Sequence, residues 1–348
     1  MPADRDDPLR PYWHPVSWSH DLTASPQAVP LLGERLVIWR DDDGDVRCFD
    51  DLCIHRGTAL SLGEVVDGCL VCPYHGWRFD SAGACSHIPQ LPPDSRIPST
   101  AAVRSYRCEE SAGLVWVALD EPVAPIPAFP EWDDPAYRHV PCPVYTWETS
   151  APRMVENFTD FGHLGWLHDG LLGSKDALVV PPHRVRQDGF ELHYEISMQV
   201  PNTNDRFAVT DLDGERGVQT NTYVLTLPHV IWLRCTYHDT GAHRTLFFAV
   251  RPDSATRSTG FCYQSRDFAL DDDDAPYAAF QDLLAEQDRV VIESQRPEEL
   301  PIDVSAELHL PFDRVAIAYS RGLAGLGVEP PSRLPVETVA PISNARVG

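Results

Sequence analysis

Two short cysteine–histidine pairs constrain the fold of this chain of 348 residues more than any other feature. The first pair is Cys53-Ile54-His55 and the second is Cys72-Pro73-Tyr74-His75, with sixteen residues between them. Gly57 and Gly76 follow the pairs, at positions where a loop backbone can approach a ligand closely. Two loops of this kind can present four ligands to one [2Fe–2S] cluster, with thiolates on one iron and imidazoles on the other.

A structural zinc site is the main alternative for these four residues, because it uses the same ligand types. The usual spacing of zinc ligands and a helix after the second pair are both missing, which disfavours zinc. Chance proximity of unconnected core residues is the other alternative. The seven remaining cysteines stand singly, and we interpret them as small buried hydrophobic residues and not as a disulfide framework: Cys48, Cys69, Cys85, Cys108, Cys142, Cys235 and Cys262.

The paired motif closely resembles the C-x-H…C-x-x-H pattern of Rieske proteins. Rieske proteins of respiratory complexes carry two more cysteines in these loops, where they form a disulfide. This chain has Thr58 and Tyr74 at those places, so it resembles the oxygenase and ferredoxin branch. A Rieske ferredoxin would end near residue 120, and the long remainder of the chain therefore indicates a further function.

Strand-like runs and prolines divide the chain into four segments. Short strands separated by turns predict an all-β domain over residues 1–120. Seven prolines in residues 121–143 predict a linker. Residues 144–328 combine helical and strand-like patterns, which predicts an α+β domain with a sheet and helices. The proline-containing tail over 329–348 is predicted to be flexible.

The second domain shows both periodicities. Helical spacing runs from Arg153 to His168, and a second helical pattern follows Pro276 to about Ser294, with Asp274 as the expected N-cap. Between them, alternating apolar residues over 190–200 predict a strand. Further strand-like runs lie at 222–227, 230–237, 245–250 and 260–264.

Polar residues within the first helical segment indicate a second metal site. Asp160 and His163 are three apart and share a helix face, whereas His163 and His168 lie about 140° apart around a regular helix. The two histidines could converge only if the helix unwinds between them, and Gly165 would allow that. Each histidine could also be an ordinary core residue with a hydrogen-bond partner.

The late helical pattern supplies a candidate carboxylate. Phe280, Leu284, Asp288 and Ile292 form one stripe, and Asp288 is the only charge on it. A carboxylate in an apolar stripe needs a partner, which could be a metal or a neighbouring arginine such as Arg289 or Arg296. Two histidines and one carboxylate form the facial triad of O₂-activating non-haem Fe(II) enzymes.

With both sites, nearly the whole chain resembles the oxygenase component of Rieske non-haem iron oxygenases. Length and layout are similar to the compact group that includes vanillate and dicamba O-demethylases. The family pattern N-x-x-D-x-x-H-x₄-H and its late aspartate match the following residues of this chain: Asn157, Asp160, His163, His168 and Asp288. Gln287 departs from the acidic residue more often expected before that aspartate.

The resemblance implies the cofactors, the partners and the residue roles. Cys53, His55, Cys72 and His75 would bind the [2Fe–2S] cluster. The two histidines and the aspartate of the facial triad would bind one mononuclear Fe(II), with Asn157 in a supporting role. An NAD(P)H-dependent reductase, directly or through a ferredoxin, would supply electrons for O₂ reduction. Asp160 would bridge its own His163 and the partner subunit's His75, which implies a head-to-tail homotrimer.

Charge and hydropathy limit the other possibilities. A net charge of −24 argues against a nucleic-acid partner. No stretch reaches the roughly 20 apolar residues of a membrane helix, and the N-terminus lacks the apolar core of a secretory signal, so we expect a cytoplasmic protein.

The leading hypothesis is therefore a terminal oxygenase that hydroxylates or oxidatively demethylates a small organic substrate, either an aromatic compound or a natural product. A Rieske ferredoxin-like electron carrier is the alternative hypothesis. The sequence does not name the substrate. We expect its pocket to be lined by the second-domain sheet and by helices around 155–170, where Phe158, Phe161, Trp166 and Leu171 could equally be core residues.

Overall fold

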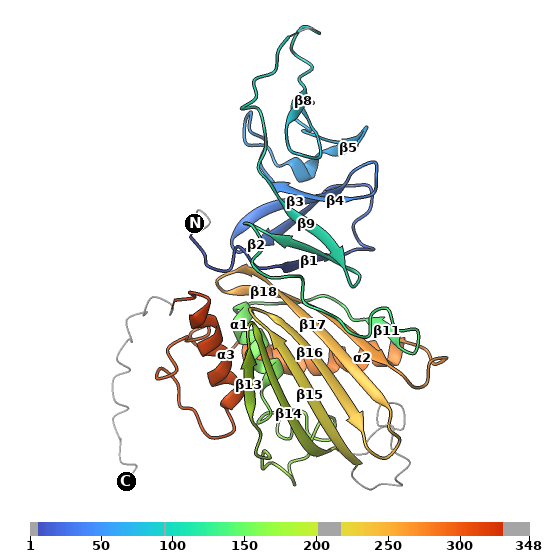
Figure 1. Cartoon of the computed structure of the whole chain (residues 1–348), viewed down its shortest axis with the longest axis vertical. Helices are drawn as coiled ribbons and strands as arrows, with labels where there is room; N and C mark the ends of the chain where they lie inside the picture. Colours follow the sequence, from blue (N-terminus) through green and yellow to red (C-terminus); the bar gives the residue numbers. More distant parts are fainter. Residues whose placement is uncertain (1–5, 94, 201–216, 330–348) are drawn as a thin grey trace, which may run out of the picture.

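A computed structural model describes residues 6–93, 95–200 and 217–329 of the chain. The predicted flexible tail lies, from residue 330 onward, outside the described residues. Figure 1 shows two stacked parts, with an N-terminal β domain above a larger domain in which helices cover one face of a long sheet. The α+β class predicted from the sequence is confirmed.

The N-terminal domain is built on a six-stranded antiparallel sheet. Its strands β3 and β4 form the hairpin that carries the acidic turn 41–45, in which Gly44 has a φ of 85°. The fully buried strand β10 lies between β1 and β9. In sheet order the strands are β1 (His14–Trp18), β10 (Leu114–Ala118), β9 (Ser105–Ser111), β4 (Val46–Asp50), β3 (Glu34–Arg40) and β2 (Gln27–Leu31).

A second, smaller sheet caps this domain at the upper end of Figure 1. It follows a single 3₁₀ turn, η1 (Leu60–Leu62), and contains short strands joined by tight loops. A buried cluster between the two sheets includes Trp39, Phe49 and Phe79. The strands are β5 (Glu64–Val66), β6 (Cys69–Val71), β7 (Arg78–Phe79) and β8 (Cys85–His87).

The second domain is organised around an eight-stranded antiparallel sheet. The alternation predicted over 190–200 is confirmed, because Leu192, Tyr194 and Ile196 point into one core. The strands are β11 (Arg138–Pro141), β12 (Tyr145–Trp147), β13 (Val185–Asp188), β14 (Glu191–Val200), β15 (Gly217–Thr226), β16 (Val230–Tyr237), β17 (His243–Ser254) and β18 (Arg257–Arg266).

The proline-rich segment 121–143 ends inside this sheet. Its residues Arg138–Pro141 form β11, an edge strand paired with β18. Proline is tolerated at a sheet edge, because the ladder there needs hydrogen bonds on one side only. The last part of the expected linker is thus part of the second domain's sheet.

Among the described residues, three helices cover one face of the sheet: α1 (Ala151–Thr159), α2 (Ala275–Ile292) and α3 (Arg314–Gly325). Asp274 occupies the N-cap position of α2, but its side chain makes no capping hydrogen bond and pairs with Arg138 and Arg266. None of the helices in the described ranges is long and apolar enough to cross a membrane.

Helix α1 is shorter than predicted, and Asp160 explains why. The predicted helix runs to His168, whereas the observed one ends at Thr159. The Asp160 carboxylate accepts hydrogen bonds from the backbone N–H groups of Gly162 (3.1 Å) and His163 (2.9 Å). In a continued helix these N–H groups would donate to backbone carbonyl groups one turn earlier. The Asp160 side chain competes with those carbonyls as the acceptor, so the helix ends and an irregular segment follows.

The two faces of the large sheet have different partners. One face packs on the helices through residues such as Leu246, Phe248 and Val250. The opposite face, including Phe247, packs on Trp116 and other residues of the N-terminal domain. Because strand residues alternate between faces, strands such as β17 contribute to both cores and connect the two domains.

Candidate active site and cluster-binding loops

The two cysteine–histidine loops have the same backbone hydrogen bonds. In the first loop Cys53 N donates to Thr58 O (2.8 Å) and Gly57 N donates to Cys53 O (2.8 Å). In the second, Cys72 N donates to Trp77 O (2.9 Å) and Gly76 N donates to Cys72 O (3.0 Å). Each glycine has a positive φ, 72° and 70°, which favours glycine at both places. The structure therefore presents the two pairs as matched loops.

The candidate ligands are arranged as a two-iron cluster requires. Cys53 and Cys72 are buried, at 2% and 1% exposure, whereas His55 and His75 are partly exposed. The rings of the two histidines are 4.6 Å apart between centroids. Thiols thus lie on the inner side and imidazoles on the outer side of one site.

Two observations fit these residues to a bound cluster. The Nδ1 atom of His55 is buried and has no hydrogen-bond partner among the described residues, so it lacks the contact that a metal would supply. Burial raises the pKa of the Cys53 thiol to about 11, and the adjacent Cys72 thiol adds to this rise, while the backbone N–H groups of His55 and Arg56 oppose it. Those N–H groups are donors that a bound thiolate would use.

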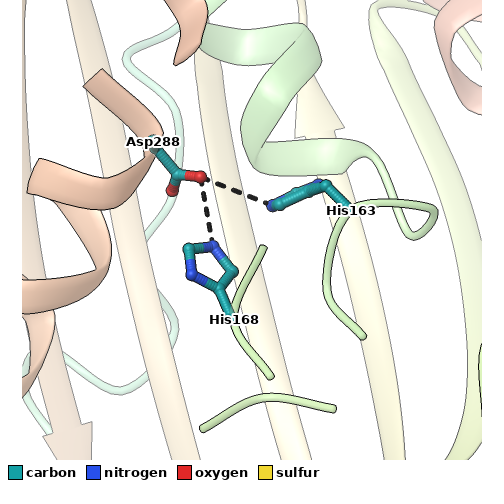
Figure 2. A group of neighbouring side chains, drawn as sticks. All are labelled: His163, His168 and Asp288. Atoms are coloured by element: carbon teal, nitrogen blue, oxygen red, sulfur yellow. Dashed lines mark ion pairs between the residues drawn. The ribbon is translucent and has the colours of Figure 1, made fainter. Parts of the chain in front are cut away.

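The second candidate site lies between α1, the irregular segment after it, and α2. His168 Nε2 is 3.1 Å from Asp288 Oδ1, and His163 Nε2 is 3.7 Å from the same oxygen. Figure 2 shows both rings directed at this carboxylate. One ligand atom from each of the three residues lies within 4.8 Å of the others. The helix ends at Thr159, before both histidines, so it is the irregular segment after α1, and not an interruption of a helix between His163 and His168, that brings the two rings together.

The far side of each imidazole is held by another side chain. His163 Nδ1 is 2.8 Å from Asp160 Oδ2, and His168 Nδ1 is 2.7 Å from Gln287 Oε1. Such partners fix the ring orientation and leave Nε2 available to a metal. Burial would raise the pKa of Asp160, but hydrogen bonds from His163 and from the Gly162 N–H outweigh burial and lower it, so this carboxyl is ionised at neutral pH.

Asp288 faces the histidines and not the neighbouring arginines. Its Oδ1 accepts a hydrogen bond from Asn157 Nδ2 at 3.3 Å. Arg289 pairs instead with Glu286 and Glu293, and Arg296 pairs with Glu298. The other carboxylate near the stripe, Asp282, accepts a hydrogen bond from Tyr145 at 2.8 Å. The alternative of a plain ion pair for Asp288 with either arginine therefore finds no support in the structure.

A pocket opens beside the three candidate iron ligands, between the sheet and α2. Phe158, Leu171 and Leu284 contribute apolar surface, and Gln219 and Asn221 of β15 contribute amide groups. Two of the side chains singled out from the sequence thus line the pocket. Phe161, by contrast, is buried in the core, and Trp166 is 64% exposed.

Sequence reasoning missed two features of this site. In the sequence Gln287 is only a departure from a family pattern, whereas in the structure its amide oxygen holds the ring of His168. Arg244, which lines the pocket from β17, was not singled out at all. The available signal was an arginine beside an apolar strand-like run, 245–250, but no local pattern tells which face of the sheet such a residue occupies.

The two halves of the chain match two family models. Residues 12–107 match the Rieske [2Fe–2S] domain, and residues 147–329 match the vanillate O-demethylase oxygenase C-terminal domain. The chain belongs to the Rieske non-haem iron oxygenases. It is a terminal oxygenase component, an enzyme that uses O₂, a Rieske-type [2Fe–2S] cluster, a mononuclear iron and electrons from a reductase.

Among its relatives are two bacterial demethylases. Methylxanthine N1-demethylase NdmA from Pseudomonas putida is 34% identical over 93% of this chain and 90% of its own length. Methylxanthine N3-demethylase NdmB of the same species is 30% identical over 90% of this chain and 88% of its own length. The structure of NdmA with caffeine superposes with a TM-score of 0.81, at 31% identity, over 94% of this chain and 98% of that one. The structure of dicamba monooxygenase bound to dicamba shares the fold, with a TM-score of 0.78 at 24% identity, over 91% of this chain and 97% of that one.

Proposed function

We propose that this oxygenase binds its cluster through Cys53, His55, Cys72 and His75 and its mononuclear iron through His163, His168 and Asp288. The observation that carries the proposal is the convergence of the last three side chains, with ligand atoms within 4.8 Å, at the wall of a pocket. A mononuclear iron held by this set supplies the O₂-activating chemistry of the class. The reaction would be hydroxylation or oxidative demethylation of a small organic molecule.

The protein's own residues prepare this site. Asp160 and Gln287 accept the Nδ1 hydrogens of the two histidines, which leaves each Nε2 atom on the side that faces Asp288, where it could bind a metal. Asn157 donates to Asp288 and limits its rotation. Apolar side chains such as Phe158 and Leu284 line the pocket and exclude water from the reacting carbon of a bound substrate.

A head-to-tail homotrimer is part of the proposal, with Asp160 as the bridge between its own His163 and the partner subunit's His75. In one chain the cluster loops lie at the upper end of Figure 1, whereas α1 and α2 lie in the lower domain. Exposed apolar residues surround the cluster loops: Leu52, Ile54, Leu62 and Tyr74. A second exposed group, Leu308, Leu310 and Phe312, lies near Asp160, because Phe312 and Asp160 both pack against Gly162. Two such patches at different ends suit a heterologous interface.

The remaining parts of the proposal concern the setting of the reaction. The electron donor would be an NAD(P)H-dependent reductase, acting directly or through a ferredoxin, in the cytoplasm. The two N-demethylase relatives support a substrate with a methyl group on nitrogen, and the match to the vanillate O-demethylase domain supports one with a methyl group on oxygen. An aromatic compound degraded for growth is the substrate class we propose.

Metal analysis combined with a turnover assay tests the proposed function. The purified protein should be red-brown, with two cluster irons and one mononuclear iron per chain. Cys53→Ser should abolish the visible spectrum, because a hard alkoxide ligates this cluster poorly. With a surrogate reductase, NADH and a panel of methoxy- and N-methyl-aromatics, at least one compound should increase O₂ uptake and release formaldehyde.

Two outcomes would contradict the proposal. A colourless protein that holds only zinc after anaerobic purification would exclude the cluster. If alanine at His163, His168 and Asp288 leaves all function intact, the protein is an electron carrier and its second domain has another role.

A further inference from the structure

Arg244 is a buried cation that opens into the pocket. It lies on β17, opposite Cys235 of β16, on the sheet face that α2 covers. Only 7% of the residue is exposed, and its Nε atom is buried without a hydrogen-bond partner in the described part of the chain. Its guanidinium carbon is 6.0 Å from the centre of the Phe280 ring, which lines the same pocket from α2.

The other buried arginines of the described chain each pair with a carboxylate, which makes the lack of such a partner at Arg244 unusual. Arg10, Arg153, Arg251 and Arg266 each have a carboxylate oxygen within 3.1 Å of a guanidinium nitrogen. Burying a charge without a partner is costly, so proteins pair such groups. Within residues 6–93, 95–200 and 217–329, Arg244 has no carboxylate partner.

The ionisable neighbours of Arg244 do not replace a carboxylate. The Cys235 thiol and the Tyr237 phenol both interact with the guanidinium. Burial raises the pKa of the Cys235 thiol, and burial raises the pKa of Tyr237 to about 12. Both groups are therefore neutral at neutral pH, and neither supplies Arg244 with a negative charge.

We infer that the substrate carries an anionic oxygen group, a carboxylate or a sulfonate, which binds Arg244 at the end of the pocket away from the candidate iron ligands. The inference rests on the proposed function and adds the substrate class to it. Phe280 and Asp288 are two turns apart on α2, roughly 12 Å along its axis. A one- or two-ring aromatic acid fits this span, with the carbon to be oxidised beside Asp288 and its anionic group on the guanidinium fork.

A binding measurement without turnover tests this inference. The probes are two matched pairs, 4-methoxybenzoate with 4-methoxybenzamide and 6-methoxy-2-naphthoate with its amide. Each is titrated calorimetrically into the holoenzyme without reductase. In the pair that fits the pocket, the acid should bind about tenfold to a hundredfold more tightly than the amide, because a charge-assisted bond to a buried guanidinium distinguishes them.

Three variants locate the origin of the preference. Arg244→Gln should remove the preference for the acid. Arg244→Lys keeps the charge but loses the planar fork, so an intermediate preference is expected. Arg186→Gln changes the net charge by the same amount at an exposed position of β13, and it should leave the preference unchanged. The visible spectrum and circular dichroism report whether each variant is folded.

The outcomes separate this inference from the proposed function. If no acid binds more tightly than its amide, or if the preference persists in Arg244→Gln, the inference is wrong. If Arg244→Gln does not fold, the wild-type pairs and Arg244→Lys still decide. A protein that prefers acids but shows no O₂-dependent turnover would contradict the proposed function alone, whereas turnover of neutral compounds without any acid preference would contradict the inference alone.

Discussion

Asp160 performs two tasks that its position makes inseparable. Its carboxylate accepts the N–H groups that would have continued α1, and the same carboxylate holds the ring of His163. Gln287 and Asp288 act on His168 in a similar way, because consecutive residues of α2 reach its two ring nitrogens, at 2.7 and 3.1 Å. At the residue scale, the same few side chains that shape the backbone also orient the candidate ligands.

The assignment of Asp288 as the carboxylate ligand is tested by comparing three alanine variants. Asp288→Ala should lose the mononuclear iron and all turnover while the Rieske spectrum stays intact, because the two sites lie on different domains. Asp282→Ala and Glu293→Ala should keep the iron, since those carboxylates contact Tyr145 and Arg289. Iron content and visible spectra are the measurements; full iron in Asp288→Ala with loss in either control would show that another carboxylate is the ligand.

Asp160→Asn separates electron transfer from metal binding. Amide and carboxylate are nearly isosteric, so both metal centres should remain. The amide cannot accept two imidazole N–H bonds as a charged carboxylate does, so we expect cluster reoxidation by O₂, with substrate present, to slow about 10- to 100-fold or more. Stopped-flow absorbance follows this step, and reduction by the reductase serves as the control. Turnover like that of the wild type would exclude the bridge.

At the scale of elements, the contact between β1 and the large sheet buries two histidines. His14 on β1 and His229, in the turn before β16, are almost completely buried, and their rings are 6.3 Å apart. Burial lowers the pKa of His14 to about 4 and that of His229 to about 3. Both are therefore neutral in the folded protein, whereas in the unfolded chain each would take up a proton near pH 6.5.

This difference predicts how stability depends on pH. Because the unfolded chain binds more protons, lowering the pH from 6.5 towards 4 should decrease the free energy of unfolding by up to about 1.4 kcal/mol per pH unit for each of the two histidines. His14→Gln removes one of these contributions, so the dependence should become shallower by that amount. Urea unfolding at pH 7.5, 6.5 and 5.5 measures it.

The exposed His20 provides the control for this measurement. His20→Gln changes a histidine that is 62% exposed, so its pH dependence should match that of the wild type. If His14→Gln and the wild type show the same slope below pH 6.5, burial of His14 does not contribute to acid sensitivity.

At the scale of the whole molecule, the two candidate metal sites occupy separate domains, which are the upper and the lower part of Figure 1. The proposed trimer makes a specific prediction about mixtures. Cys53→Ser chains lack the cluster but keep Asp160, and Asp160→Asn chains keep the cluster but lack the bridge. When such chains exchange, a cluster from one should serve the iron site of the other, and mixed trimers should recover part of the activity.

Mass spectrometry of differently tagged chains verifies that exchange has occurred. Turnover in mixtures that clearly exceeds the sum of the residual turnover of the two separate variants supports transfer between subunits. Complete exchange without recovery would show that the electron path stays within one chain.

The sequence by itself determined the parts of this protein that depend on local spacing. Cys53 and Cys72, each with a histidine close by and a glycine four residues on, suffice to define two matched loops, because such loops are closed by hydrogen bonds within six residues. The apolar alternation of β14 and the stripe on α2 likewise follow from short periodicities.

Only the tertiary structure decided which residues face one another across the second domain. The end of α1 depends on whether two backbone N–H groups donate their hydrogen bonds to the Asp160 side chain or to helix carbonyl groups. Both arrangements satisfy the local hydrogen bonding. The roles of Gln287 and Arg244 depend on partners that lie far away in the sequence, His168 for Gln287 and Phe280 for Arg244. Side-chain contacts of that kind are set by how α2 packs on the sheet, and no local pattern contains that information.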